Sequence, residues 1–384
     1  MLLPAHGVTT MTNKILHIIK NETVLSVAVI LAVISAFFVK PDMEYLSYID
    51  FRTLALLFCL MAVMTGFQKT GVFKIMAGRL LKRIHNIRGL SFILIMLCFL
   101  SSMLVTNDVA LITFVPFTFV ILDMTGSETK DFLIIRTVVM QTVAANLGSM
   151  LTPIGNPQNL YLHGISGMGV GEFMLLMFPY TAISFLLLSA WTVLRNKKTS
   201  IQIKLESVTQ ITEKRKVAVY ALLFIICLAT VGRIIDYRIT LLIVMAVIAA
   251  TDYKIFAGVD YTLLLTFIAF FIFIGNMGRV NVFSNYISSV IIGHECITGI
   301  LSSQLISNVP AALLLSGFTD NLRPLIVGVN LGGLGTLIAS MASLISFKFV
   351  GRENKALRGK YLLYFTAVNV LFLIVLLGLY YFER

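Results

Sequence analysis

Four polar interruptions lie inside apolar runs of this 384-residue sequence, and they hold the residues best suited to binding small ions. They are residues 106–108, 155–159, 307–310 and 332–340. Asn, Ser and Thr side chains offer short neutral donors and acceptors that suit both anions and cations. Where such a stretch is unwound, its carbonyl oxygens can hold a cation, and the amides of a following helix can hold an anion. The chemistry indicated is reversible ion binding.

Asp108 is the one acidic residue deep in an apolar run. One interpretation is structural, because an acid at the start of a helix stabilises that helix. The other is functional, because an ionisable group at membrane depth is by default a cation ligand or a proton carrier. We favour the functional interpretation, with sodium or a proton as the coupling ion and no other metal or cofactor.

The predicted site draws on all four interruptions. For a substrate we expect contacts from Thr106, Asn107, Asn156, Pro157, Ser307, Asn308, Val309 and Ser340. For a coupling cation we expect Asn107, Asp108, Thr152, Gly155, Asn156, Asn308, Gly335 and Thr336. An alternative stays open, because small residues also let membrane helices pack closely. It applies most to Ser101, Ser102, Gly148, Gly332 and Gly333.

Catalytic residues are not predicted. A protease or metalloenzyme within the membrane needs a nucleophile beside a base, or clustered His and carboxylate ligands. His163 and His294 each stand alone, and the sequence has no HExxH motif. We therefore expect no enzyme activity.

Composition places the chain in a membrane. Hydrophobic residues make up 58% and charged residues 12%, whereas a soluble domain carries roughly 25% charged residues. The net charge of +12 comes from basic residues in short segments between apolar runs, which is typical of membrane topology and not of nucleic-acid binding. Membrane lipid is the expected surrounding.

The apolar runs predict an all-α integral membrane protein. Nine runs read as crossings, several of them short: 23–39, 52–66, 131–151, 172–194, 217–232, 239–251, 258–276, 322–346 and 361–381. Two further runs, 89–122 and 294–319, are interrupted in the middle, and each arm has only roughly 10–17 residues, too few to span comfortably. We expect both to be re-entrant hairpins whose tips stop at mid-membrane.

Basic segments set the predicted topology and the division of the chain. The basic stretches 195–216 and 348–360 should both be cytoplasmic, which requires the run 294–319 to return to the side it left. The basic N-terminus shares that side with 195–216 only if the run 89–122 also returns. The N-terminus is then cytoplasmic and the C-terminus periplasmic, in the inner membrane. The predicted parts are a cytoplasmic or interfacial segment 1–21, a first repeat 22–194, a cytoplasmic linker 195–216, and 217–384, which holds an inverting helix and a second repeat.

Internal similarity supports two repeats. At an offset of 210, Asp50 matches Asp260 and Lys69 matches Arg279. Further along, the three residues from Asn146 match the three from Asn330. The predicted topology makes the two copies antiparallel, so the fold should contain inverted repeats with broken helices. Such repeats are typical of secondary transporters, whose binding site lies near the midplane.

The runs TNDVAL at 106–111 and GSMLTPIGNPQNL at 148–160 resemble the ion transporter superfamily, in particular its arsenite-permease and citrate-transporter-like anion permeases. The resemblance covers nearly the whole chain after residue 20. It implies a homodimeric secondary transporter for a small anion or oxyanion, coupled to sodium or protons, with a scaffold and a transport domain that moves as an elevator. A sodium/proton antiporter, an arsenite efflux permease and an anion channel remain as alternatives.

Overall fold

The computed structural model describes residues 22–81, 84–123, 130–196 and 213–383. The predicted segment 1–21 and most of the predicted linker 195–216 lie outside these residues. The regular elements of the described chain are helices, which confirms the all-α class. The first half contains α2 (Thr23–Phe38), α3 (Tyr45–Tyr48), α4 (Phe51–Thr70), α5 (Val72–Leu81), α6 (Ile87–Ser101), α7 (Asn107–Asp123), α8 (Lys130–Ser149), α9 (Pro157–Ser166) and α10 (Val170–Arg195).

The second half contains α11 (Lys214–Val231), α12 (Tyr237–Asp252), α13 (Tyr261–Arg279), α14 (Asn281–Ile291), α15 (Glu295–Ile306), α16 (Asn308–Ser316), α17 (Leu322–Leu331), α18 (Met341–Glu353) and α19 (Arg358–Phe382). Short 3-10 turns η1 (Tyr253–Gly258), η2 (Leu337–Ala339) and η3 (Lys355–Leu357) join some of them. Among the described residues, 6 helices are long and apolar enough to cross a membrane, or 7 if α14 and α15, bent by 109°, count as one span.

The run 322–346, predicted to be a crossing, is not one continuous helix, and it breaks at the predicted interruption 332–340. Helix α17 ends at Leu331, and helical structure resumes only at Met341 in α18. The cause is a run of glycines, of which Gly335 has φ +113, a conformation that only glycine adopts readily. The side chain of Gln304 replaces the missing helical bonds: its Nε2 donates to the carbonyl oxygens of Gly332 and Leu334 (both 2.9 Å), and its Oε1 accepts from the Thr336 amide (2.8 Å).

Each predicted hairpin is a pair of packed helices joined by a short connection. Helices α6 and α7 are joined by residues 102–106, and α15 and α16 by Ser307 alone. A matching interruption at 150–156 separates α8 from α9. That the hairpin tips stop at mid-membrane remains a prediction.

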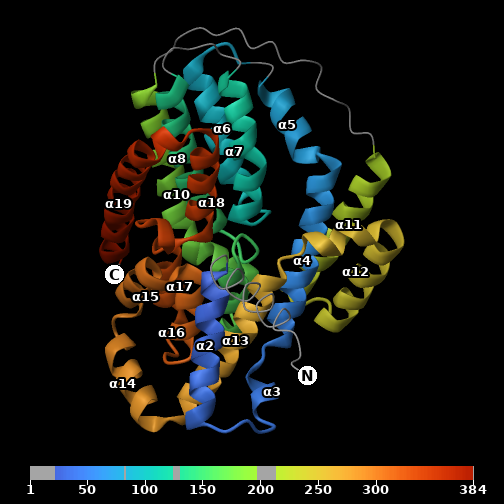
Figure 1. Ribbon diagram of the computed structural model, residues 1–384, viewed down its shortest axis with the longest axis vertical. Coiled ribbons are helices and arrows are strands. Elements are labelled where there is room, and N and C mark those ends of the chain that lie inside the picture. Colours follow the sequence, from blue (N-terminus) through green and yellow to red (C-terminus); the bar gives the residue numbers. More distant parts are fainter. Residues whose placement is uncertain (1–21, 82–83, 124–129, 197–212, 384) are drawn as a thin grey trace, which may run out of the picture.

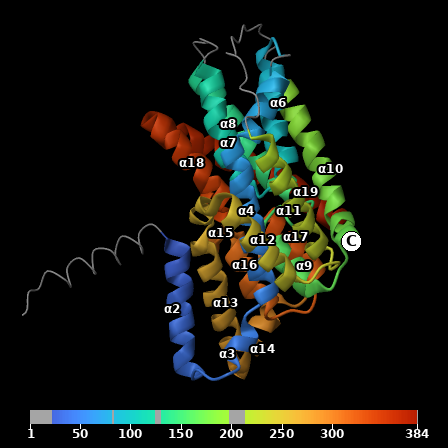
Figure 2. The ribbon, with the colours of Figure 1, turned by 90° about the vertical axis from the view of Figure 1, so that its right-hand side faces the viewer.

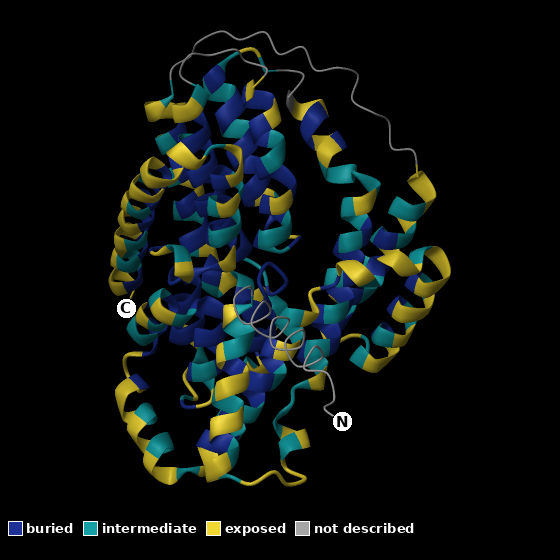
Figure 3. Cartoon of the chain, viewed as in Figure 1, coloured by how far each residue is buried: buried dark blue, intermediate teal, exposed yellow. Residues whose placement is uncertain are grey.

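The helices form a bundle and a separate outer group (Figures 1 and 2). In the bundle α8 packs against α6, α7, α18 and α19, and 89% of its spanning window is buried. In the outer group α4 packs against α11 and α12, and α2 lies along α13. The α12 span is only 22% buried, so α8 is the centre of the bundle and α12 lies at its periphery, as the burial colouring also shows (Figure 3).

Two ion pairs join the halves at related positions. Lys69 Nζ at the end of α4 lies 3.4 Å from Asp252 Oδ2 at the end of α12. Arg279 Nη1 at the end of α13 lies 2.8 Å from Asp42 Oδ2, which follows α2. The hydrogen bond from Arg279 holds the pKa of Asp42 below its usual range. Lys69 and Arg279 are 210 positions apart, and so are Asp42 and Asp252, so the same contact occurs twice with the halves exchanged.

Two close packing contacts repeat this relationship. A Cβ atom on Gly258 would lie 2.5 Å from Cγ2 of Thr65, and one on Gly275 would lie 2.2 Å from the ring of Tyr48. Thr65 and Gly275 share the offset of 210, as do Tyr48 and Gly258. In each contact one half supplies the glycine and the other supplies the larger side chain. Together with the ion pairs, these contacts support the predicted inverted repeat.

Candidate functional site

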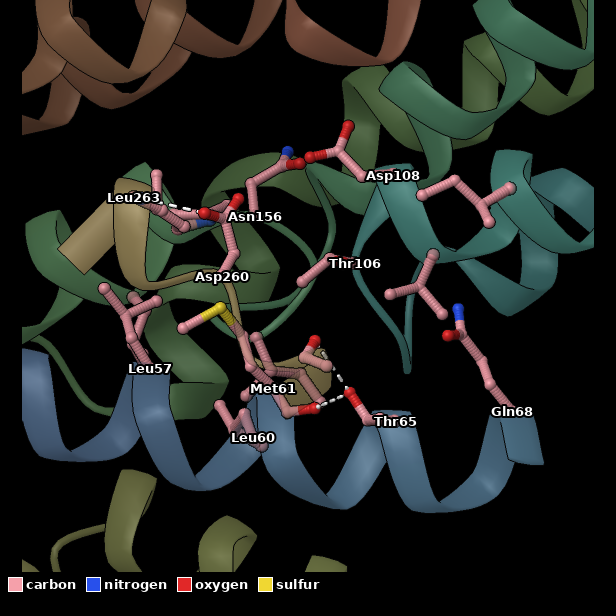
Figure 4. A pocket seen from close by; sticks show the side chains of 16 residues that line it. Leu57, Leu60, Met61, Thr65, Gln68, Thr106, Asp108, Asn156, Asp260 and Leu263 are labelled. Atoms are coloured by element: carbon pink, nitrogen blue, oxygen red, sulfur yellow. Dashed lines mark hydrogen bonds between the residues drawn. The ribbon is translucent and has the colours of Figure 1, made fainter. Parts of the chain in front are cut away.

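A cavity of about 170 Å³ lies where α4, α7, α9 and the start of α13 meet (Figure 4). It holds four of the predicted site residues, namely Thr106, Asp108, Asn156 and Pro157. Among the described residues that line it, none is Lys, Arg or His, whereas two carboxylates, Asp108 and Asp260, face it. The cavity is therefore suited to a cation and has no basic side chain to hold a bare anion.

Two oxygens at this cavity lack a hydrogen-bond donor. Asp108 Oδ1 and Asn156 Oδ1 are both inaccessible to solvent and have no partner among the described residues. The Asn156 side chain is only 3% exposed, and its Nδ2 donates to Ser149 Oγ at 2.7 Å, which fixes the orientation of the amide. Buried polar atoms are normally satisfied, so a carboxylate oxygen and an amide oxygen left free beside a cavity are candidate ligands for a hard cation.

Asn107 holds the tip of the first hairpin in place. Its backbone amide donates to the Gly155 carbonyl (3.2 Å), so the tip and the break between α8 and α9 are joined directly. Its side-chain Oδ1 accepts from the amide of Asp108 (2.9 Å), and its Nδ2 donates to Asn146 Oδ1 (3.0 Å). These bonds begin α7 and place Asp108 at the cavity.

Asn146 connects the first half to the second. Its Nδ2 lies 3.2 Å from the Gly333 carbonyl oxygen and 3.1 Å from Ser340 Oγ. The matching residue Asn330 donates to Asn159 Oδ1 at 2.7 Å, in the opposite direction between the halves. Neither asparagine was among the predicted site residues, although their match within the repeat was a signal that could have found them.

The second hairpin tip lines a separate cavity of about 400 Å³. Ser307 and Val309 lie on it, together with the start of α18 and of α2. The two cavities share Asp260 and Leu263. Two interruptions thus meet at the first cavity, namely the first hairpin tip and the α8–α9 break. At the second cavity the second hairpin tip meets the start of α18, and no residue of the interruption 332–340 lines either cavity. Lys348 is the one basic residue among the described residues that line either cavity.

The remaining predicted residues lie around these cavities and do not line them. Asn308 is buried, and a Cβ on Gly333 would approach its Nδ2 to 3.1 Å. Three predicted cation ligands are occupied by bonds within the protein. Thr152 Oγ1 donates to the Met103 carbonyl at 2.5 Å, Thr336 Oγ1 donates to the Gln304 carbonyl at 3.2 Å, and the Gly155 carbonyl accepts from Asn107. Gly335 packs against Gln304.

The glycines and serines left open between packing and binding have packing contacts here. A Cβ on Gly148 would lie 2.0 Å from the Phe99 carbonyl oxygen and 2.5 Å from Ser102 Oγ. A Cβ on Gly332 would lie 2.6 Å from Ser303 Oγ. The repeat relates Gly148 to Gly332 and Ser102 to Ser303. These positions let each broken helix approach the first arm of its hairpin, which favours the packing interpretation.

Comparison with known proteins places this geometry in a family. Residues 8–324 match the model of the citrate transporter family. An uncharacterised transporter of Methanocaldococcus jannaschii is 34% identical over 88% of this chain and 91% of its own length. The inner membrane protein YbiR of Escherichia coli is 29% identical over 88% of this chain and 90% of its own. The silicon efflux transporter LSI3 of Oryza sativa subsp. japonica is 31% identical over 37% of this chain and 28% of its own. This chain belongs to the citrate transporter family and is a multi-pass membrane transporter.

Proposed function

We propose that the protein is a secondary active transporter that moves a small anion or oxyanion across the inner membrane, coupled to sodium or protons. The observation that carries the proposal is the cavity at the first hairpin tip, where Asp108 and Asn156 each present a buried oxygen without a donor. A cation or proton at these oxygens satisfies both atoms and cancels the charge of Asp108.

Binding of the cation then favours binding of the anion. The unpaired carboxylate of Asp108 repels an anion, and a bound cation removes that repulsion. The substrate contacts come from the interruptions themselves, as predicted: Thr106, Asn107, Asn156, Pro157, Ser307, Asn308, Val309 and Ser340. The N-termini of α7, α9 and α16 start at these interruptions and contribute partial positive charge. The two affinities are linked reciprocally, so each ligand strengthens the other.

Movement of the bundle past the outer group gives alternating access in this proposal. The second hairpin joins the bundle through α17, which packs against α15, α16 and α8, so both hairpins move with the bundle. The outer group is held together by contacts that recur between the halves, Lys69 with Asp252 and Arg279 with Asp42. An elevator in a homodimer fits this division and the family resemblance.

A sodium/proton antiporter is the second candidate function. The first cavity favours it, because among the described residues its lining contains carboxylates and no base. An antiporter exchanges one cation for another at such a carboxylate and requires no anion. The two functions are distinguished by whether sodium or proton flux needs an added anion.

The proposal is tested with Asp108→Asn in proteoliposomes. Uptake is screened over citrate, dicarboxylates, arsenite and silicate, with sodium and proton gradients imposed separately. We expect the parent to concentrate one of these solutes and Asp108→Asn to abolish gradient-driven uptake while remaining folded and membrane-inserted. Asp131→Asn is the matched control, since Asp131 is exposed in the first turn of α8 and does not line the cavity. If Asp108→Asn still concentrates the solute, Asp108 serves only as a helix cap.

A further inference from the structure

Two aspartates begin equivalent helices but use their oxygens differently. Asp50 is the N-cap of α4, and both of its oxygens are occupied: Oδ1 accepts from the Thr53 amide (3.0 Å) and Oδ2 accepts from Thr53 Oγ1 (2.5 Å). Asp260 is the N-cap of α13, and its Oδ1 accepts from the Leu263 amide (2.9 Å). Leu263 stands where the first half has Thr53 and has no hydroxyl group. The described residues show no hydrogen bond to Asp260 Oδ2, and Asp260 is exposed, unlike Asn156.

Asp260 faces the cavity that also holds Asp108 and Asn156 (Figure 4). Its position is fixed from the α4 side, because Thr65 Oγ1 donates to the carbonyl of Gly258 (3.2 Å), two residues before Asp260. The three free oxygens belong to different parts of the molecule. Those of Asp108 and Asn156 come from the hairpin tip and the start of α9, and that of Asp260 comes from the start of α13, which packs along α2.

Beside the two carboxylates, the cavity is lined by a third oxygen that is not acidic, Oδ1 of Asn156. Asn156 is buried, with 3% of its surface exposed, and it lines the same cavity. Its Oδ1 has no donor among the described residues. Two carboxylates and an amide oxygen around one small cavity, without a base in its described lining, are oxygen ligands of the kind that a hard cation needs. Without a cation or a proton, the two carboxylates repel one another.

We infer that Asp260 is a ligand of the coupling cation, supplied by the outer group and completing the site that Asp108 and Asn156 begin. This inference rests on the proposed function. Its consequence is that the cation site is divided between two groups of helices. When α7 and α9 move relative to α4 and α13, Asp108 and Asn156 leave Asp260, and the affinity for the cation falls. The cation site is complete in the conformation described here and incomplete once α7 and α9 have moved away from α4 and α13.

The test compares Asp260→Asn with Asp50→Asn in the purified full-length protein. Asparagine caps helices about as well as aspartate, so both variants keep their caps, and only Asp260→Asn loses charge at the cavity. Sodium chloride is titrated against choline chloride at constant ionic strength, and thermal stabilisation is followed, since a bound ligand stabilises the folded state. A second arm replaces the sodium titration with a pH titration in choline chloride, which reports proton binding.

We expect Asp260→Asn to raise the half-saturating concentration of the cation about tenfold or more, as loss of one charged partner does, and Asp50→Asn to match the parent. If Asp260→Asn also matches the parent while Asp108→Asn no longer responds, Asp260 is only a cap and the proposed cation site stands. If Asp260→Asn and Asp50→Asn weaken cation binding equally, the effect comes from helix capping and the inference is overturned. If Asp108→Asn responds like the parent, or the parent responds to neither cation, the proposed cation site fails and the inference fails with it.

Discussion

Ser307, the residue between the two helices of the second hairpin, has a backbone conformation that serine rarely adopts. Its φ of 74° and ψ of 154° lie in a region occupied almost exclusively by glycine, at a cost of about 1–3 kcal/mol. Within the described ranges its hydroxyl donates only to Asn308 Oδ1 and to the Ala339 carbonyl, both at 3.5 Å, and such long bonds are weak. The side chain therefore does not compensate for the backbone, and such strain is typical of ligand sites.

Substitution separates the strain from the hydroxyl group. We expect Ser307→Gly to raise the free energy of unfolding by about 1 kcal/mol, because glycine adopts this conformation at little cost. Ser307→Ala keeps the strain and should not stabilise the protein. Both variants should lose substrate affinity if the hydroxyl binds substrate. Thermal melting of the purified variants gives the first comparison, and an alanine variant more stable than the glycine variant would rule out backbone strain at this position.

Asn107 and Asn308 hold corresponding places, each at the start of its hairpin's second helix, but their bonds differ. The amide of Asn107 bonds to Asn146 and to the backbone of Asp108. The Asn308 Oδ1 accepts a long contact of 3.5 Å from Ser307 Oγ. The sequence contains the match between Asn107 and Asn308 but not these partners, because they depend on packing between distant helices. Asp260 was not predicted either: the sequence matches it to Asp50, but only the packing of α13 shows that it faces the cavity that holds Asp108.

At the scale of elements, most helices could be predicted from apolar runs, because a helix in lipid must satisfy its own backbone. The runs at 52–66, 131–151 and 172–194 correspond to α4, α8 and α10. The run 322–346 is divided into α17 and α18 at the interruption predicted from its polar residues and glycines, which hydropathy alone does not register. Its glycines were visible in the sequence, but the Gln304 side chain that stabilises the unwound chain comes from another helix.

Gly148 tests how closely the broken helices must pack. The Cβ of an alanine at this position would lie 2.0 Å from the backbone oxygen of Phe99, and a backbone atom within α6 cannot move away cheaply. We expect Gly148→Ala to lower the free energy of unfolding by about 3 kcal/mol or more. Gly378→Ala is the control within α19, where a Cβ meets nothing within 4 Å and the better helix former should be neutral or stabilising by up to about 1 kcal/mol. Similar melting temperatures for the two variants would contradict this packing.

At the scale of the whole molecule, the positions of the termini test the inverted arrangement. Basic residues of 348–360 favour the cytoplasm, and one crossing by α19 then places the C-terminus in the periplasm. We expect alkaline phosphatase fused after Glu383 to be active, since it folds only outside the cytoplasm. The same enzyme fused within the linker 195–216 should be inactive and serves as the control. Activity in the linker fusion and not in the C-terminal fusion would reverse the topology.

The contact between α2 and α13 also affects how the chain is made. Asn276 of α13 donates to Ser35 Oγ (2.9 Å) and to Tyr45 OH (2.8 Å), across 241 and 231 positions. At about 5–20 residues per second, a ribosome adds Asn276 roughly 10–50 s after it has added Ser35. Ser35 Oγ donates to the Ala32 carbonyl within its own helix (2.7 Å), so α2 can reside alone in lipid during that interval with its hydroxyl proton satisfied. Biosynthesis must therefore hold α2 in the membrane without its partner until α13 has been made.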